Sequence, residues 1–132
     1  MGIEFAVSEL ISATRESIYE AWLDSSGHSG MTGSPAKVSG VEGEFFEAWD
    51  GYITGKNLEL QYPSRILQRW RTVEFDDSDE DSLLEILLEP DVRGTRVTIR
   101  HTNLPDHGMQ SKQGWIDAYF IPMKNYFADD AF

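Results

Sequence analysis

The side chains best suited to chemistry are histidines and carboxylates, because the chain contains no cysteine. A histidine has an ordinary pKa of about 6.5, so His101 could serve as a general base with Asp50 as its acid–base partner. No companion nucleophile accompanies His101, and the sequence lacks a glycine-rich phosphate loop and a nucleophile elbow. We therefore name His101 and Asp50 as catalytic candidates only for the case that the protein is an enzyme.

Metal and cofactor sites are not expected. His28, His101 and His107 stand at no recognised ligand spacing, and the absence of cysteine excludes a thiolate zinc site. The acidic run Asp76–Asp81 separates two strand-like segments, but it lacks the spaced ligands, the central glycine and the terminal glutamate of an EF-hand. We interpret this run as a solvated loop, and we predict neither a metal ion nor a cofactor.

The elements that must position these residues are mostly β-strands. Residues Ile3–Ile11 alternate loosely between polar and apolar, and the later strands follow one another with turn-forming residues between them. These later strands are expected at Phe45–Asp50, Tyr52–Gln61, Arg65–Phe75, Ser82–Glu89 and Thr95–Thr102. Their regular spacing predicts an antiparallel meander.

Helices are expected near both ends. Residues Arg15–Asp24 have the spacing of an amphipathic helix, and the small residues of Ser25–Pro35 indicate a loop or a short broken helix. Within the last 25 residues, Pro122 should kink a long helix. One face of this helix carries Trp115, Tyr119, Met123 and Tyr126. The pattern predicts an α+β fold, in which a curved antiparallel sheet wraps around a long kinked C-terminal helix.

The two faces of the predicted sheet differ in character. Strand alternation puts Phe46, Trp70 and His101 on the inner face, opposite Trp115 and Tyr119 of the helix. Such large rings either fill an aromatic core that contains one satisfied histidine, or line a ligand pocket between sheet and helix. The outer face is predicted to carry a stripe of arginine, glutamate and arginine across three neighbouring strands.

Length and charge exclude several classes of protein. The 132 residues fit one domain, which we assign to residues 1–132. The net charge of −12 argues against nucleic acid and against anionic membranes as partners. Neither a membrane-spanning apolar run nor a signal-peptide pattern is present in the sequence, so we expect a cytoplasmic protein.

An ordered set of short motifs resembles a known family. The set comprises Ile18 to Trp22 with Asp24, Met31-Thr32-Gly33, Ala36, Phe46, Ala48, Trp49-Asp50-Gly51-Tyr52-Ile53, Gly55, Arg65-Ile66, Trp70-Arg71, Leu84-Glu85-Ile86, Gly94-Thr95, His101 and Gly114-Trp115. It is similar to the SRPBCC (START-like, Bet v 1-like) superfamily, in the group named after the activator of heat-shock protein 90 ATPase. The resemblance implies a helix-grip fold with short helices after the first strand and a hydrophobic cavity between sheet and C-terminal helix.

Three functions follow as hypotheses. The preferred one is a binding module for a small hydrophobic or aromatic ligand. Its predicted ligand-binding residues are Met31, Phe46, Trp70, His101, Trp115 and Tyr119. The resemblance also suggests a chaperone-modulating interaction protein or a polyketide-cyclase-like enzyme. The oligomeric state and the identity of the ligand cannot be predicted from the sequence.

Overall fold

The computed structural model describes residues 3–105, 108 and 110–128. Along the chain, one strand is followed by two helices, then by five consecutive strands and finally by the C-terminal helical segments. The described residues include six strands: β1 (Ile3–Ile11), β2 (Phe45–Ala48), β3 (Ile53–Gln61), β4 (Arg65–Thr72), β5 (Ser82–Asp91) and β6 (Gly94–Leu104). The helical segments are α1 (Arg15–Trp22), α2 (Ser25–Thr32), α3 (Gln110–Trp115), a π-helical turn η1 (Ile116–Phe120) and α4 (Ile121–Ala128).

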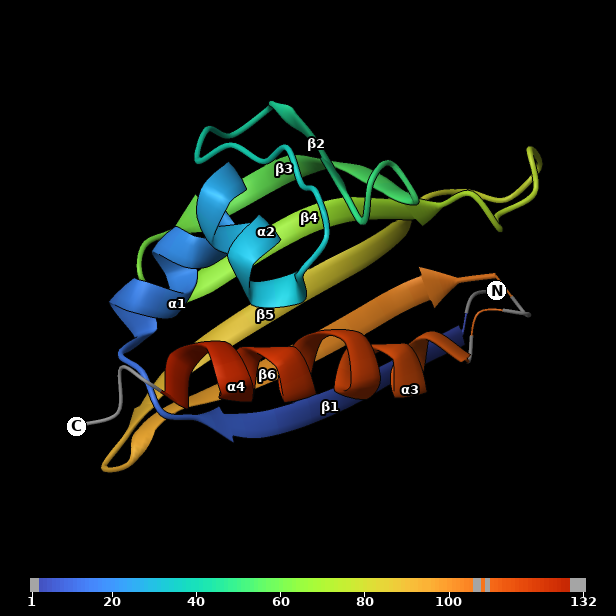
Figure 1. Ribbon diagram of the computed structural model, residues 1–132. Helices are drawn as coiled ribbons and strands as arrows, with labels where there is room; N and C mark the ends of the chain where they lie inside the picture. The colour runs from blue at the N-terminus through green and yellow to red at the C-terminus, as the bar shows by residue number, and fades with distance from the viewer. Residues whose placement is uncertain (1–2, 106–107, 109, 129–132) are drawn as a thin grey trace.

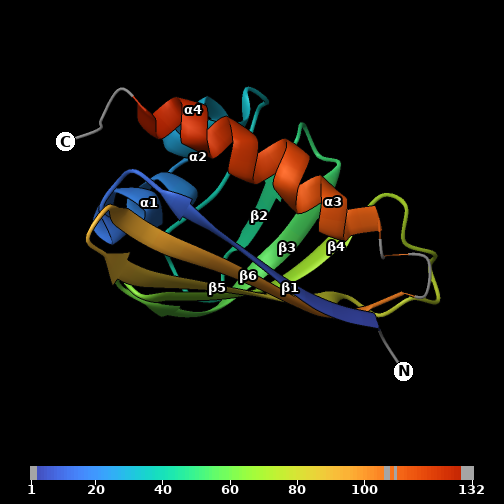
Figure 2. The same ribbon diagram turned by 90° about the horizontal axis from the view of Figure 1, so that it is seen from below.

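The strands form a single antiparallel sheet in the order β1-β6-β5-β4-β3-β2. Strands β2 to β6 are therefore neighbours in chain order, as the predicted meander requires, and β1 pairs with β6 at the far edge. The C-terminal helical segments cross one face of the curved sheet, and α1 and α2 cover one end of the same face (Figures 1 and 2). This arrangement confirms the α+β, helix-grip prediction.

The core lies between this face of the sheet and the helices. Ile66, Leu84 and Ile99 of the three central strands are at most 1% exposed, and Trp115 and Met123 bury their side chains from the helical side. These residues occupy the inward positions that strand alternation predicts. Burial of apolar surface contributes about 25 cal/mol per Å² to stability, and it is the main interaction that holds the helix against the sheet.

The outer face of the sheet carries the predicted stripe of opposite charges. Glu85 of β5 accepts a hydrogen bond from Arg65 Nε of β4 at 2.6 Å, and Arg100 Nη1 of β6 lies 3.8 Å from the other carboxylate oxygen. Arg65 also contacts Glu59 of β3 at 2.7 Å. Glu85 is thus paired with arginines from both neighbouring strands, as the predicted stripe requires.

The segment after α1 is more regular than its composition indicates. Residues Ser25–Thr32 form helix α2, because Asp24 caps its N-terminus by accepting a hydrogen bond from Gly27 N at 2.8 Å. Gly33 then ends the helix with φ 79°, a left-handed conformation that glycine adopts without strain. Asp24 therefore starts α2, although the sequence pattern had placed it at the end of the preceding helix.

The expected irregularity at Pro122 takes the form of a π-helical turn. Proline lacks an N–H and its ring would clash with the carbonyl four residues earlier in a regular helix. In the structure, Ile121 N donates to Ile116 O, five residues back, so the hydrogen-bond register shifts just before Pro122. A helical path therefore continues from Gln110 to Ala128, although none of the described helices is long and apolar enough to cross a membrane.

Candidate functional site

A pocket of about 510 Å³ opens between the sheet and the C-terminal helix. This volume lies within the range usual for small-molecule sites. Six aromatic rings stand in its wall, and the remaining described lining residues are small, aliphatic or hydroxyl-bearing, apart from one carboxylate. The lining comprises Trp49, Tyr52, Ile53, Trp70, Thr72, Glu74, Phe75, Gly108, Ser111, Gly114, Trp115, Ala118 and Tyr119.

The floor of the pocket is a continuous stack of rings from sheet to helix. The ring centroids of Trp70 in β4 and Trp115 in α3 are 5.9 Å apart, and those of Trp115 and Tyr119 are 4.7 Å apart. Tilted ring pairs at these distances contribute roughly 0.5–1.5 kcal/mol each beyond their burial. The floor therefore consists of rings packed directly on one another, and Tyr119 reaches it from the π-helical turn.

The side wall comes from the turn between β2 and β3. Trp49 and Asp50 have φ of 55° and 56°, and Gly51 has φ 88°, so the chain reverses through three left-handed residues. This unusual turn places the Trp49 ring edge-on to Tyr119 at 6.0 Å. The Asp50 side chain is exposed, while its backbone N–H donates to Pro35 O at 2.9 Å.

The polar groups of the pocket lie at its rim. Tyr52 donates its hydroxyl to Glu74 Oε2 at 2.7 Å, and Glu74 N donates to Thr72 Oγ1 at 3.1 Å. Burial raises the pKa of Tyr52, and the hydrogen bond to Glu74 raises it further, so the tyrosine keeps its proton at neutral pH. The rim therefore presents hydroxyl groups and one carboxylate to a ligand.

Behind the floor, His101 is completely buried and both of its ring nitrogens have partners. Trp115 Nε1 donates to His101 Nδ1 at 3.1 Å, so this nitrogen carries no proton. His101 Nε2 must then donate to Ser82 Oγ at 2.7 Å, and the Ser82 hydroxyl in turn donates a hydrogen bond to Trp70 O at 2.9 Å. Burial lowers the pKa of His101 to about 3, which keeps the ring neutral. This chain of hydrogen bonds fixes the two tryptophans of the floor.

A second buried histidine holds the other side of the floor. His28 Nδ1 donates to Trp22 O at 2.9 Å, and Tyr119 donates its hydroxyl to His28 Nε2 at 3.0 Å. Burial lowers the pKa of His28 and raises the pKa of Tyr119, so both groups are neutral. This role of His28 is not visible in the sequence, because its partner Tyr119 is 91 residues away.

The pocket contains half of the predicted ligand-binding residues. Trp70, Trp115 and Tyr119 line it, whereas Met31, Phe46 and His101 are buried outside the lining. The Phe46 ring instead covers Gly55, where an added Cβ would lie 2.5 Å from its Cζ. A ligand contact of these three residues stays a prediction without geometric support from the pocket.

The lining also includes aromatic residues that sequence reasoning missed. Trp49, Tyr52 and Phe75 fall in turns or at strand ends, where the two-residue alternation of a strand no longer applies. The short segment Trp49-Asp50-Gly51-Tyr52 was noted only as part of a family motif. The two rings of Trp49 and Tyr52 flank a tight turn, and this pattern could have indicated that both lie at one end of the sheet.

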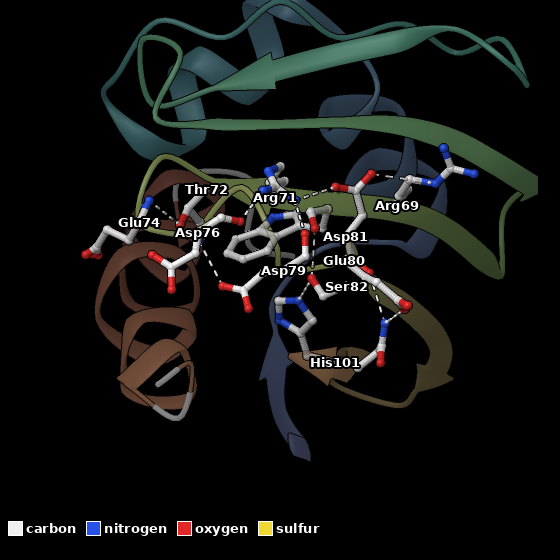
Figure 3. Close-up of polar contacts among 12 residues, drawn as sticks. Arg69, Arg71, Thr72, Glu74, Asp76, Asp79, Glu80, Asp81, Ser82 and His101 are labelled. Carbon is white, nitrogen blue, oxygen red and sulfur yellow. Dashed lines mark hydrogen bonds and ion pairs between the residues drawn. The ribbon is translucent and has the colours of Figure 1, made fainter. Parts of the chain in front are cut away.

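The acidic loop after β4 is organised around Arg71. As Figure 3 shows, Arg71 donates to the carbonyl oxygens of Asp76 and Asp79, both at 2.7 Å, and to Asp81 Oδ1 at 3.1 Å. Two backbone carbonyl oxygens and one carboxylate of the loop thus bind the guanidinium group of Arg71. Among the described residues no cluster of histidine, aspartate or glutamate could hold a metal, and His107 lies outside them.

Comparison with known proteins places this fold among solved structures. An HSP90 activator from Plasmodium falciparum is 21% identical, with a TM-score of 0.85 over 96% of this chain and 97% of that chain. The Aha1 dimer of Colwellia psychrerythraea is 18% identical, with a TM-score of 0.73 over 86% of this chain and 88% of that one. A protein from the dynemicin biosynthetic locus is 15% identical, with a TM-score of 0.79 over 97% of this chain but only 48% of its own.

At these identities the solved structures establish the fold alone. No curated protein matches the sequence. The sequence does match a family described as activator of Hsp90 ATPase homolog 1-like protein, over residues 12–128. That match spans most of the chain, from the end of β1 to the end of α4, and includes every element that lines the pocket. The protein therefore belongs to the activator of Hsp90 ATPase homolog 1-like family.

Proposed function

We propose that the protein binds a small hydrophobic or aromatic ligand in the pocket between the sheet and the C-terminal helix. The observation that carries this proposal is an aromatic-lined space of about 510 Å³ between the sheet and the C-terminal helix. Concave, mostly apolar spaces of this size with a few polar groups are typical of small-molecule sites. A flat apolar ligand would gain dispersion contacts with Trp70, Trp115 and Tyr119.

Catalysis is not part of this proposal. His101 is 0% exposed, both its nitrogens are engaged, and its pKa of about 3 makes the ring a weak base near neutral pH. Asp50 is exposed in the β2–β3 turn. A general base must reach the proton that it removes, so this placement gives no support to an acid–base pair.

The binding proposal can be tested with an uncharged fluorescent probe, N-phenyl-1-naphthylamine. We expect saturable fluorescence enhancement at one site per chain. Gly114 lines the pocket, and an added Cβ there would meet no atom within 4 Å. The variant Gly114→Phe should therefore remain folded while it occupies the space, and weaken probe binding by about tenfold or more.

The matched control places the same ring on the same helix outside the pocket. Gln113 is exposed and does not line the pocket, so Gln113→Phe should bind the probe as the native protein does. Circular dichroism and thermal unfolding establish that both variants fold. Absence of saturable binding to the native protein, or equal affinity in Gly114→Phe, would refute the proposal.

A second candidate function is modulation of a chaperone ATPase. It is favoured by the family to which the chain belongs and by the similarity to a structure named as an HSP90 activator. The test adds the purified protein to a heat-shock protein 90 from the same organism. An unchanged ATPase rate over a range of protein concentrations would exclude it.

A further inference from the structure

The charge distribution around the pocket narrows the class of ligand. Glu74 is the one charged side chain among the described lining residues, and no lysine or arginine of the described chain lines the pocket. Lys112 belongs to the adjacent helix α3, but its side chain is exposed and does not line the space. An anionic headgroup would thus find no cation to pair with, and it would face a carboxylate at the rim.

The segment that forms this rim is strongly acidic. Residues 69 to 81 contain six carboxylates and only two guanidinium groups. Both arginines are occupied, since Arg69 pairs with Asp81 at 3.8 Å and Arg71 binds Asp81 and two backbone carbonyls. The excess of negative charge beside the opening attracts cations and repels anions.

The aromatic wall suits a cation as well. The face of an aromatic ring is electronegative, and a positive group within about 6 Å of a ring centroid is attracted to it. Phe75 of this wall already accepts such a contact, with Arg71 Cζ 5.4 Å from its ring centroid. Tyr52, next to Glu74, adds a second ring at the same side of the pocket, so rings and carboxylate converge at the rim.

We infer that the pocket selects an amphipathic organic cation, an ammonium group carried on an aromatic or aliphatic body. This inference rests on the proposed function and specifies its ligand class. The apolar body lies against Trp70, Trp115 and Tyr119, while the ammonium group lies at the rim within reach of Glu74 and Tyr52. Fatty acids and other apolar anions of the same size are disfavoured.

Three probes of nearly equal size separate charge from hydrophobicity: 3-phenylpropylamine, 3-phenylpropan-1-ol and 3-phenylpropanoate. Each is titrated against the N-phenyl-1-naphthylamine complex at neutral pH. We expect the amine to bind about tenfold more tightly than the alcohol, and the carboxylate to bind most weakly. Added salt should weaken the binding of the amine and leave that of the alcohol nearly unchanged.

The variant Glu74→Gln removes the charge and retains an oxygen that can accept from Tyr52. It should bind the alcohol as before and lose about threefold or more of its affinity for the amine. The control Glu89→Gln makes the same change in net charge at an exposed position of β5 outside the pocket, and it should leave the amine affinity unchanged.

The outcomes distinguish the two proposals. If the alcohol binds as tightly as the amine or more tightly, the cation inference is refuted while the hydrophobic pocket stands. If the preference for the amine persists in Glu74→Gln, or is lost equally in Glu89→Gln, the assignment of Glu74 is refuted. If none of the three compounds nor the naphthylamine binds, both proposals fail.

Discussion

The buried His101 should make the stability of the fold fall as the pH drops below 7. Its pKa is lowered by burial from 6.5 to about 3 in the folded protein, whereas the unfolded chain has the ordinary value. Below about pH 6.5 the unfolded state therefore binds a proton that the folded state refuses. By linkage, the free energy of unfolding decreases from about pH 6.5 down to about pH 3, by about 1.4 kcal/mol per pH unit over most of that window.

Between about pH 7 and about pH 5, the titration of His101 lowers the free energy of unfolding by about 2 kcal/mol. His28 acts in the same direction, because burial lowers its pKa too. The carboxylates whose pKa is lowered, Glu9 and Asp91, lose their contribution only at lower pH, below their ordinary pKa near 4. The window from about pH 7 to about pH 5 thus isolates the buried histidines.

The measurement is denaturant unfolding, followed by tryptophan fluorescence at several pH values, for the native protein and for His101→Gln. Glutamine can accept from Trp115 and donate to Ser82, and it does not titrate. We expect the variant to be about 1–3 kcal/mol less stable near neutral pH. We also expect it to lose about 2 kcal/mol less than the native protein on going to about pH 5.

Equal pH dependence in the two proteins would refute the argument. A direct reading is available even if His101→Gln does not fold, because nuclear magnetic resonance of the native protein follows the His101 Cε1 proton during a pH titration. A midpoint near the ordinary value of 6.5 would show that the ring is accessible to protons, contrary to its complete burial.

Two further changes test the packing and the outer face of the sheet. Gly55→Ala should lower the free energy of unfolding by about 3 kcal/mol or more, because the added Cβ would lie 2.0 Å from Arg69 O. In the same denaturant assay the control Gly40→Ala, whose added Cβ meets no atom within 4 Å, should change the free energy of unfolding by less than about 0.5 kcal/mol. Glu85→Gln should lower the free energy of unfolding by about 1 kcal/mol at low salt and by less at high salt, because it weakens the half-buried ion pair with Arg65. A loss of stability that does not depend on salt would contradict this electrostatic origin.

The sheet was predictable from the sequence because its signals are local. Alternation over two residues put Leu84, Ile86 and His101 inward and Glu85 outward, and the turns between the strands fixed which strands are neighbours. The charged stripe followed from this order alone. The family resemblance added the helix-grip arrangement, which the fold confirms.

The site was less predictable because it depends on depth and not only on direction. Alternation indicates that Trp70 and His101 point inward, but it cannot tell that one reaches the pocket while the other is sealed behind it. Trp49 was missed for a related reason, since a left-handed backbone with φ 55° turns its side chain out of the strand pattern. Whether large rings fill a space or surround it depends on how the helix is seated above them.

The buried polar groups show where a ligand can be recognised. Gln68 Nε2 donates to Asn57 Oδ1 at 2.8 Å, His101 binds Ser82 and Trp115, and within the described chain no buried side-chain nitrogen or oxygen lacks a partner. Interior hydrogen bonds are thus already made, and a ligand that broke one would leave a buried group unsatisfied at a cost of about 1–3 kcal/mol. Polar recognition must then occur at the rim, while the interior contributes shape and dispersion. A ligand that enters this pocket should therefore carry its one polar group at the end that stays near solvent.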